Sequence, residues 1–497
     1  MASFSSQYAS ALQKTKDDAS DFAAWTALLA LAEKDEATIA MRQESFDGFL
    51  SLYPLCYGYW IKFAKLMHAS GDYAASEKIY IRGCEAVRES VDMWLGYCSA
   101  VVAWEQEPGK RSREAFEKAV SAVGRHPDGG SLWQAYAASE RDTAARTAVY
   151  ERAVRQPLKN SDVIWSEFEK LAAPQVVEDA MAARKPVLEA AAARQHFESA
   201  VSSRPYFHVT PVPEDIKEAW SSYLDFEAQS GSSLETVEFL FKRCLIVCAN
   251  YPEFWIKYAS WCEERGEDDD AAENVFSLAT SIFVKDKPSV WFAYAEHMEA
   301  RGKIEDSRSV FERIEKIRSG LVETAVRRAH FERRQGRAAE AEDILKSAAA
   351  AANEDAPKAF CIVHLARIRK CMGASNEVVR KTYADAGVSN AHLSISFADF
   401  ELASGKGGVD RARAIFQAAL GSDSKLSDKE KTDIFHLYIE MEESMGTSIR
   451  GVRKAKEQYR NWLSSSRKRS AAPGGIAPNA KRARAAAHNG HHTMHAR

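Results

Sequence analysis

The sequence predicts an all-α fold, an α-solenoid of helical-hairpin repeats arranged in two arrays. Large aromatic residues recur at steps of three, as in Trp220, Tyr223 and Phe226, and this spacing places them on one stripe of a helix. A glycine follows at Gly231, where a left-handed residue commonly ends a helix. The pattern returns with a period of about 35 residues, which is typical of stacked helical hairpins.

Length and composition agree with a long helical array. The chain has 497 residues, of which 46% are hydrophobic and 10% aromatic, with only 14 prolines and 25 glycines. This length exceeds one ordinary core, and the aromatic content excludes a wholly disordered chain. No apolar run is long enough for a membrane span, and residues 1–20 lack the apolar core of a secretory signal. The eight scattered cysteines favour free buried thiols in a reducing compartment.

The first array is predicted over residues 21–175, after an N-terminal segment of residues 1–20. Tryptophans mark the start of the hairpins, and the steps from Trp60 to the next three are 34, 39 and 32 residues. A second helix then returns in each hairpin with its own aromatic residue, as at Phe116 and Tyr150. The markers of this array are Trp25, Trp60, Trp94, Trp133 and Trp165.

The rhythm breaks over residues 176–215, which are predicted to form a long helix and a proline-rich connector. Three prolines within residues 205–213 cannot lie inside a helix, so this part is expected to be extended. The neighbouring aromatics, Tyr206 and Phe207, suggest that the connector packs against the rest of the chain. We place the boundary between the two arrays here.

The second array is predicted over residues 216–463. It begins with Trp220, Trp255 and Trp291, and four later hairpins keep the same phase without tryptophan. Across both arrays, glycines occupy one position of the hairpin, where each is expected to end the first helix. These eight glycines are Gly71, Gly231, Gly266, Gly302, Gly336, Gly373, Gly405 and Gly446.

The motif resembles the half-a-tetratricopeptide (HAT) repeat. Its first helix carries Trp, then Tyr or Phe, then Phe-Glu, and its second helix carries Tyr/Phe-Glu-Arg-Ala. Plain tetratricopeptide repeats, the nearest alternative, favour small residues at these positions. Among HAT-repeat proteins, residues 53–60, 90–94 and 251–259, and above all Arg-Pro-Tyr-Phe-His-Val at 204–209, resemble the pre-mRNA-processing factor 39 family. The likeness covers roughly residues 20–463.

This resemblance implies a nuclear, non-catalytic scaffold of the U1 small nuclear ribonucleoprotein. Such a scaffold acts in pre-mRNA splicing and 5′ splice-site recognition through contacts with proteins of that particle. The resemblance also implies a homodimer, or a heterodimer with a related HAT-repeat protein, for which the apolar last helix around Tyr459 and Trp462 is the expected interface. The alternative is a HAT-repeat scaffold of another complex, in 3′-end cleavage and polyadenylation or in ribosomal RNA processing.

Two sets of repeated side chains have both a structural and a binding interpretation. The aromatic stripe could stack on single-stranded RNA, but its spacing places it between the helices of each hairpin, so we expect a core. The glutamates at its edge and the arginines Arg152, Arg243 and Arg313 could bind a partner, but we expect them to pair between neighbouring repeats. These glutamates are Glu140, Glu227, Glu332, Glu401 and Glu442.

No residue pattern predicts an enzyme, a cofactor or a small-molecule substrate. No Ser-His-Asp, Cys-His or paired-carboxylate arrangement stands out. Cys244 and Cys248 lie four residues apart with Cys262 nearby, but the four-ligand spacing of a zinc site is absent. We therefore expect buried thiols here and no metal.

Residues 464–497 are predicted to form a disordered basic tail. They hold seven of the 67 Lys and Arg residues and none of the 70 Asp and Glu residues, which leaves a formal charge of −10 on the remainder. Because that remainder is acidic, RNA contact is expected to be indirect or weak, although the tail could touch RNA phosphates. Two basic clusters have the form of a bipartite nuclear localisation signal, made of Arg467, Lys468, Arg469, Lys481, Arg482 and Arg484.

Overall fold

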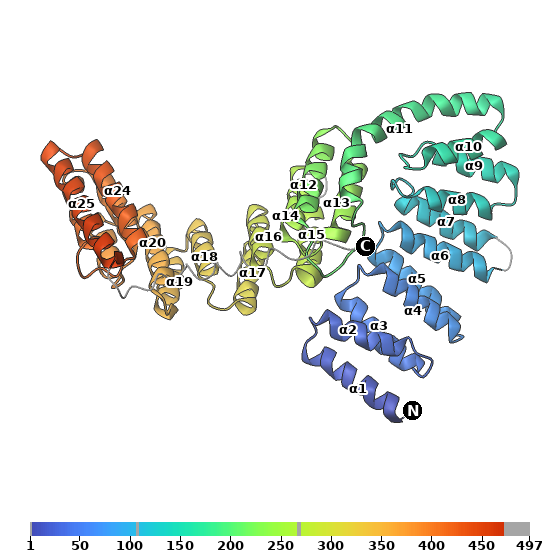
Figure 1. Cartoon of the computed structure of the whole chain (residues 1–497), viewed down its shortest axis with the longest axis horizontal. Coiled ribbons are helices and arrows are strands. Elements are labelled where there is room, and N and C mark those ends of the chain that lie inside the picture. The colour runs from blue at the N-terminus through green and yellow to red at the C-terminus, as the bar shows by residue number, and fades with distance from the viewer. Residues whose placement is uncertain (1, 106–108, 266–269, 472–497) are drawn as a thin grey trace. The chain divides into compact units, whose positions relative to one another are not determined.

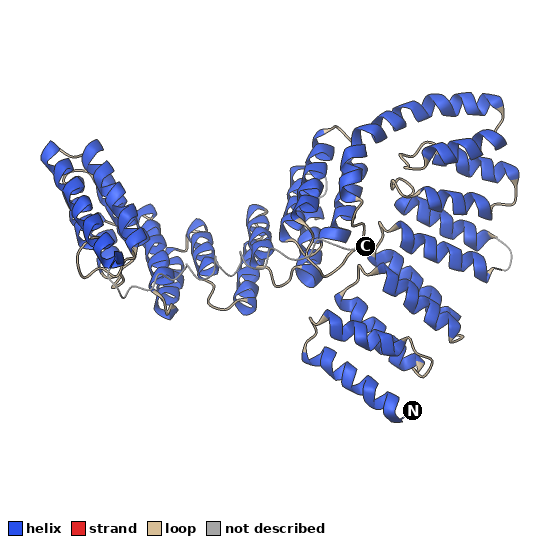
Figure 2. Cartoon of the chain, in the orientation of Figure 1, coloured by secondary structure: helices blue, strands red, loops and turns tan. Residues whose placement is uncertain are grey.

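The computed structural model describes residues 2–105, 109–265 and 270–471, with side chains described between residues 4 and 466 (Figure 1). These residues form helices joined by loops and contain no strand (Figure 2). The predicted all-α solenoid is confirmed. The chain divides into two compact units, Met1–His297 and Met298–Arg497. None of the described helices is both long and apolar enough to span a membrane.

The first unit consists of helices that pair into antiparallel hairpins. Aspartates begin several of them: Asp21, Asp72 and Asp142 accept a hydrogen bond from the backbone N–H three residues on, at 3.0, 3.0 and 2.9 Å. The helices are α1 (Ala2–Asp17), α2 (Phe22–Ala32), α3 (Ile39–Leu52), α4 (Tyr57–Ala69), α5 (Tyr73–Ala86), α6 (Val91–Trp104), α7 (Lys110–Val123), α8 (Gly130–Ser139), α9 (Thr143–Ala153), α10 (Ser161–Leu171), α11 (Pro174–Val201), α12 (Glu214–Gln229), α13 (Leu234–Cys248), α14 (Pro252–Arg265), α15 (Ala271–Leu278) and the π-helix η1 (Ala279–Phe283).

The second unit continues the same hairpin pattern. Helix α16 (Pro288–Ala300) contains the division between the units, and the predicted connector lies inside the first unit. The connector as the boundary between two arrays stays a prediction. The remaining helices are α17 (Ile304–Ile317), α18 (Val322–Arg334), α19 (Ala338–Ala351), α20 (Asp355–Cys371), α21 (Asn376–Ala384), α22 (Ala391–Ala403), α23 (Gly408–Ala419), α24 (Asp428–Ser444) and α25 (Ile449–Ala471).

The aromatic stripe forms the core, as predicted. The eight marker tryptophans are at most 9% exposed. In five hairpins the indole N–H donates to the carbonyl oxygen six residues earlier, in the loop that enters the hairpin, at 2.7–3.0 Å. The tryptophan therefore joins the core of its hairpin to that loop. These five pairs are Trp25 with Ala19, Trp60 with Pro54, Trp94 with Arg88, Trp255 with Ala249, and Trp291 with Lys285.

Six of the eight predicted glycines end their helices in the left-handed conformation, with φ between 73° and 84°. Gly446 also follows the end of its helix, α24, but it does not adopt the expected left-handed conformation. A Cβ atom there would lie 2.4 Å from the Glu442 carbonyl oxygen, so this position needs a small residue and not an unusual φ. Gly266 lies outside the described residues.

Both ends of the chain contain more helix than the repeat pattern indicates. Residues 2–17 form α1, which lies against α2, and its buried Tyr8 donates the hydroxyl proton to the Met41 carbonyl of α3 at 2.9 Å. At the other end, α25 continues to Ala471, beyond the predicted start of the tail at Ser464. The Ser466 hydroxyl donates to the Asp428 carboxylate of α24 at 2.6 Å and holds this extension against the last hairpin.

Candidate protein interaction surfaces

Five buried glutamates join neighbouring hairpins. Each is at most 5% exposed, and each accepts two hydrogen bonds of 2.5–3.2 Å from an arginine on the preceding helix. Two parallel hydrogen bonds between one guanidinium and one carboxylate fix the relative orientation of the two side chains, in addition to the attraction between their charges. The prediction that these glutamates pair between repeats is confirmed. The pairs are Glu140 with Arg113, Glu227 with Arg194, Glu332 with Arg308, Glu401 with Arg380, and Glu442 with Arg413.

The sequence did not identify these five arginine partners. Their separations from the glutamates are 27, 33, 24, 21 and 29 residues, so no fixed spacing marks them. Two predicted arginines form other pairs between neighbouring hairpins. Arg152 donates to Glu117 at 2.6 and 2.9 Å, and Arg243 donates to Glu198 at 2.8 and 3.0 Å. Burial acts to raise the pKa of Glu198, but the hydrogen bonds and charge of Arg243, together with the Tyr223 hydroxyl and the charge of Lys159, lower the pKa overall.

The proline-rich connector is docked within the first unit. The Arg204 guanidinium donates to the carbonyl oxygens of His208, Thr210 and Pro211 at 2.9, 2.7 and 2.9 Å, which holds the connector in a bend. Phe207 is buried, and its ring lies 6.5 Å from that of Tyr53 at the end of α3. The prediction that this segment packs against the chain is therefore confirmed, and Arg204 explains why the motif begins with arginine.

The first unit contains a groove of about 1040 Å³. Its walls come from the loops before α8 and α10 and from α11, α12 and α13. An ion pair of 3.1 Å between Arg125 and Glu235 joins two of these walls. Leu188 of α11 is 38% exposed in the groove, so an apolar side chain is available to a partner. The size exceeds that of most small-molecule sites and suits a polypeptide segment.

A smaller cavity of about 390 Å³ adjoins the groove, and Arg243 and Glu198 line both. Trp220 lines this cavity, and its buried indole N–H has no hydrogen-bond partner among the described residues. The carbonyl six residues earlier belongs to Glu214, which is the first residue of α12, so the bond made by five other tryptophans is absent here. His126 also lines the cavity, and burial, together with Arg243, lowers the pKa of this histidine well below its usual value.

The predicted dimer residues lie on the last helix, α25. The rings of Tyr459 and Trp462 are stacked, with 6.2 Å between centroids, and both lie against Phe435 of α24 at 5.2 and 5.5 Å. The Tyr459 hydroxyl also hydrogen bonds with His436 at 3.1 Å. Both rings remain partly exposed. Their role in dimerisation stays a prediction.

The predicted localisation signal falls at the edge of the described residues. Arg467, Lys468 and Arg469 lie in the last turns of α25, and their side chains are not described. Lys481, Arg482 and Arg484 lie outside the described residues.

All eight cysteines lie within the described residues, and no disulfide bond joins any two of them. Cys244, Cys248 and Cys262 are buried, and burial raises the pKa of Cys244. Cys371 is exposed and Cys56 is half-buried, so the expectation of buried thiols holds for the other six. Within the described ranges, no group of three His, Cys, Asp or Glu side chains is placed to hold a metal ion.

The geometry first defines a class of protein. Stacked helical hairpins with an aromatic core and paired charges between repeats form an α-solenoid. The crystal structure of CstF-77 matches this fold with a TM-score of 0.62, over 82% of this chain and 89% of that chain, at 16% identity. This likeness shows the fold.

The sequence then gives the family. The family model described as PRP39 N-terminal HAT repeat matches residues 9–170, and the model described as PRP39 C-terminal HAT repeat matches residues 192–334. The chain therefore belongs to the PRP39 family of HAT-repeat proteins. It is 27% identical to pre-mRNA-processing factor 39 of Homo sapiens, over 97% of this chain and 82% of the relative. The identity to the Danio rerio protein of the same name is 29%, over 94% and 71%.

Proposed function

We propose that the chain is a non-catalytic nuclear scaffold of the U1 small nuclear ribonucleoprotein that acts in pre-mRNA splicing and supports 5′ splice-site recognition. The observation that carries this proposal is the match of both family models, together with relatives that are named pre-mRNA-processing factors. An α-solenoid suits the role because stacked repeats expose extended surfaces on which several proteins can bind.

The groove of the first unit is our candidate for one contact with a particle protein. Its apolar residue Leu188 is exposed, while the charged side chains Arg194 and Arg243 are held by Glu227 and Glu198. A partner can therefore gain apolar contact without breaking the pairs that hold the hairpins together.

Pull-down from nuclear extract, followed by RNA sequencing, tests the proposal. We expect U1 RNA well above background with the full chain, and a clear loss of it with Leu188→Glu, which places a charge in the groove. The matched control is Met181→Glu, because Met181 lies on the same helix, is 56% exposed and is outside the groove. Absence of U1 RNA with the unaltered chain would refute the role in this particle. Enrichment of 3′-end processing or ribosomal RNA factors would favour the alternative scaffold.

A further inference from the structure

A row of four rings crosses three first helices of hairpins in the second unit. His330 of α18 hydrogen bonds through Nε2 with Nδ1 of His364 on α20 at 2.9 Å. Phe360 of α20 follows, with its ring 4.7 Å from His364 and 6.0 Å from His392 of α22. Phe360 is 38% exposed and His392 is also exposed, so the row reaches the surface. We call these four residues the ring row.

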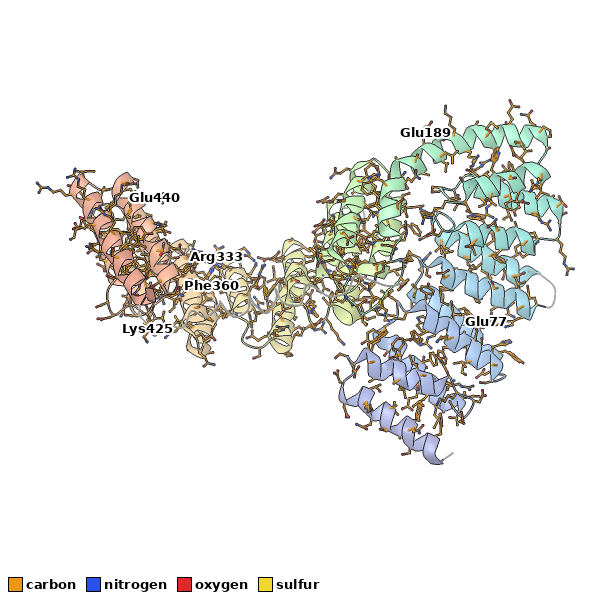
Figure 3. The ribbon with its side chains drawn as sticks, in the orientation of Figure 1. Glu77, Glu189, Arg333, Phe360, Lys425 and Glu440 are labelled. Atoms are coloured by element: carbon orange, nitrogen blue, oxygen red, sulfur yellow. The ribbon has the colours of Figure 1, made fainter. Side chains whose placement is uncertain are left out.

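Two arginines flank the ring row without a close acidic partner. Among the described residues, no carboxylate lies within 4.0 Å of the charged nitrogens of Arg333 on α18 or Arg367 on α20, whereas Arg334 is paired with Glu299 at 2.6 Å. Arg333 and Phe360 can be located in Figure 3. The positive charge of Arg367 acts to lower the pKa of Asp399 on α22. Burial has the larger effect, and the pKa of this carboxyl group is raised.

The charge of the second unit agrees with an anionic ligand. Residues 298–463 contain 29 of the 67 Lys and Arg residues and 25 of the 70 Asp and Glu residues, so they are basic even without the tail. Residues 1–297 contain 31 and 45 and are strongly acidic. Burial, together with His330 and Arg367, lowers the pKa of His364 to about 4, so this part of the ring row is uncharged at neutral pH. The positive charge is carried by the arginines.

We propose that the ring row, with Arg333 and Arg367, binds single-stranded RNA. The exposed rings of Phe360 and His392, beside two arginines without a close acidic partner, offer base stacking and phosphate contact together. Proteins that bind single-stranded nucleic acids commonly combine these two contacts. An acidic peptide would use the arginines but not the flat rings. The rings and arginines suit any single-stranded nucleic acid, and the choice of RNA over DNA rests on the proposed function.

Fluorescence anisotropy with a labelled, unstructured RNA of about 12 nucleotides tests this on the purified full chain. Arg333→Ala with Arg367→Ala should make the slope of log K against log salt shallower by about 1.4, since each phosphate contact on a single strand contributes about 0.7. The matched control is Lys316→Ala with Lys381→Ala, which removes the same charge from exposed sites on α17 and α21. This control should leave the slope unchanged.

Phe360→Ala should weaken binding by about fivefold or more at each salt concentration with the slope retained, and Phe360→Trp should preserve affinity because it keeps a stacking face. Circular dichroism melting of each variant checks that it is folded. Equal behaviour of the arginine and lysine pairs, or no effect of Phe360→Ala, would overturn the proposal. So would competition by a poly-glutamate peptide as strong as that by RNA of the same charge. Since these assays need no ribonucleoprotein, their failure is distinct from failure to recover U1 RNA.

Discussion

At the level of single residues, the repeat motif buries polar groups together with their hydrogen-bond partners. The marker tryptophans are buried, and most of their indole N–H groups are satisfied by a loop carbonyl. The glutamates at the edge of the stripe are equally buried and are satisfied by arginines of the preceding helix. A buried polar group that loses its partner carries the full cost of desolvation, so these residues are expected to be sensitive to substitution.

Trp255→Phe should destabilise the first unit more than Trp220→Phe. The Trp255 N–H donates to the Ala249 carbonyl at 2.7 Å, and its loss leaves that carbonyl unpaired, whereas the Trp220 N–H has no partner among the described residues. The difference in the free energy of unfolding is expected to be about 1–2 kcal/mol. Urea unfolding followed by circular dichroism measures it, and equal effects of the two substitutions would contradict the role assigned to the indole bond.

Arg194→Ala should cost about 3 kcal/mol or more, because it leaves the carboxylate of Glu227 buried without its charged partner. The control is Lys170→Ala, which removes an exposed pair with Glu167 at 2.6 Å and should cost less than about 1 kcal/mol. Denaturant midpoints compare the two variants. A similar loss for both would mean that the buried pairs do not hold the hairpins together.

At the scale of elements, the sequence predicted the parts that repeat and missed the parts that do not. The three-residue steps from Trp220 specify a buried stripe, so the hairpins and their core could be predicted. Helix α1 has no tryptophan, and it is held by the Tyr8 hydroxyl, a contact that periodicity does not reveal. Gly446 shares the position of the other glycines but serves close packing, because identity alone does not fix φ. Arg204 was part of a recognised motif, yet its three carbonyl contacts depend on the folded bend.

Arg204→Ala should loosen the connector. The loss of three hydrogen bonds to carbonyl oxygens frees residues 204–213, and Arg204→Lys should rescue little because an ammonium group lacks the planar fork of the guanidinium. Hydrogen exchange measured by mass spectrometry should show faster exchange in this segment, with the hairpins of the second unit unchanged as the internal control. Unaltered exchange in residues 204–213 would contradict the proposed role of Arg204.

At the scale of the whole molecule, charge and surface differ between the two units. The composition predicts one acidic body before the tail, but the division between His297 and Met298 separates an acidic unit from a basic one. Sequence alone could not show this, because the division falls inside α16, where no break in composition marks it. The ring row could not be predicted from the sequence either, because His330, His364 and His392 become neighbours only when successive hairpins stack.

Dimerisation through the last hairpin is a prediction at this scale. Light scattering at micromolar concentration should give twice the monomer mass of 55.3 kDa, and Tyr459→Ala with Trp462→Ala should shift the chain to the monomer. Because both rings also pack on Phe435, a melting curve must show that the variant is folded. A monomer mass for the unaltered chain, with no related HAT-repeat protein co-purifying from extract, would contradict the predicted dimer.

The proposed scaffold works through protein contacts within the U1 particle. The most direct measurement is a pull-down from nuclear extract that is treated with ribonuclease before washing, followed by mass spectrometry of the retained proteins. We predict that proteins of the U1 particle remain bound after the RNA is digested. Their complete release with the RNA, or their absence from the untreated sample, would show that the chain does not act through such protein contacts.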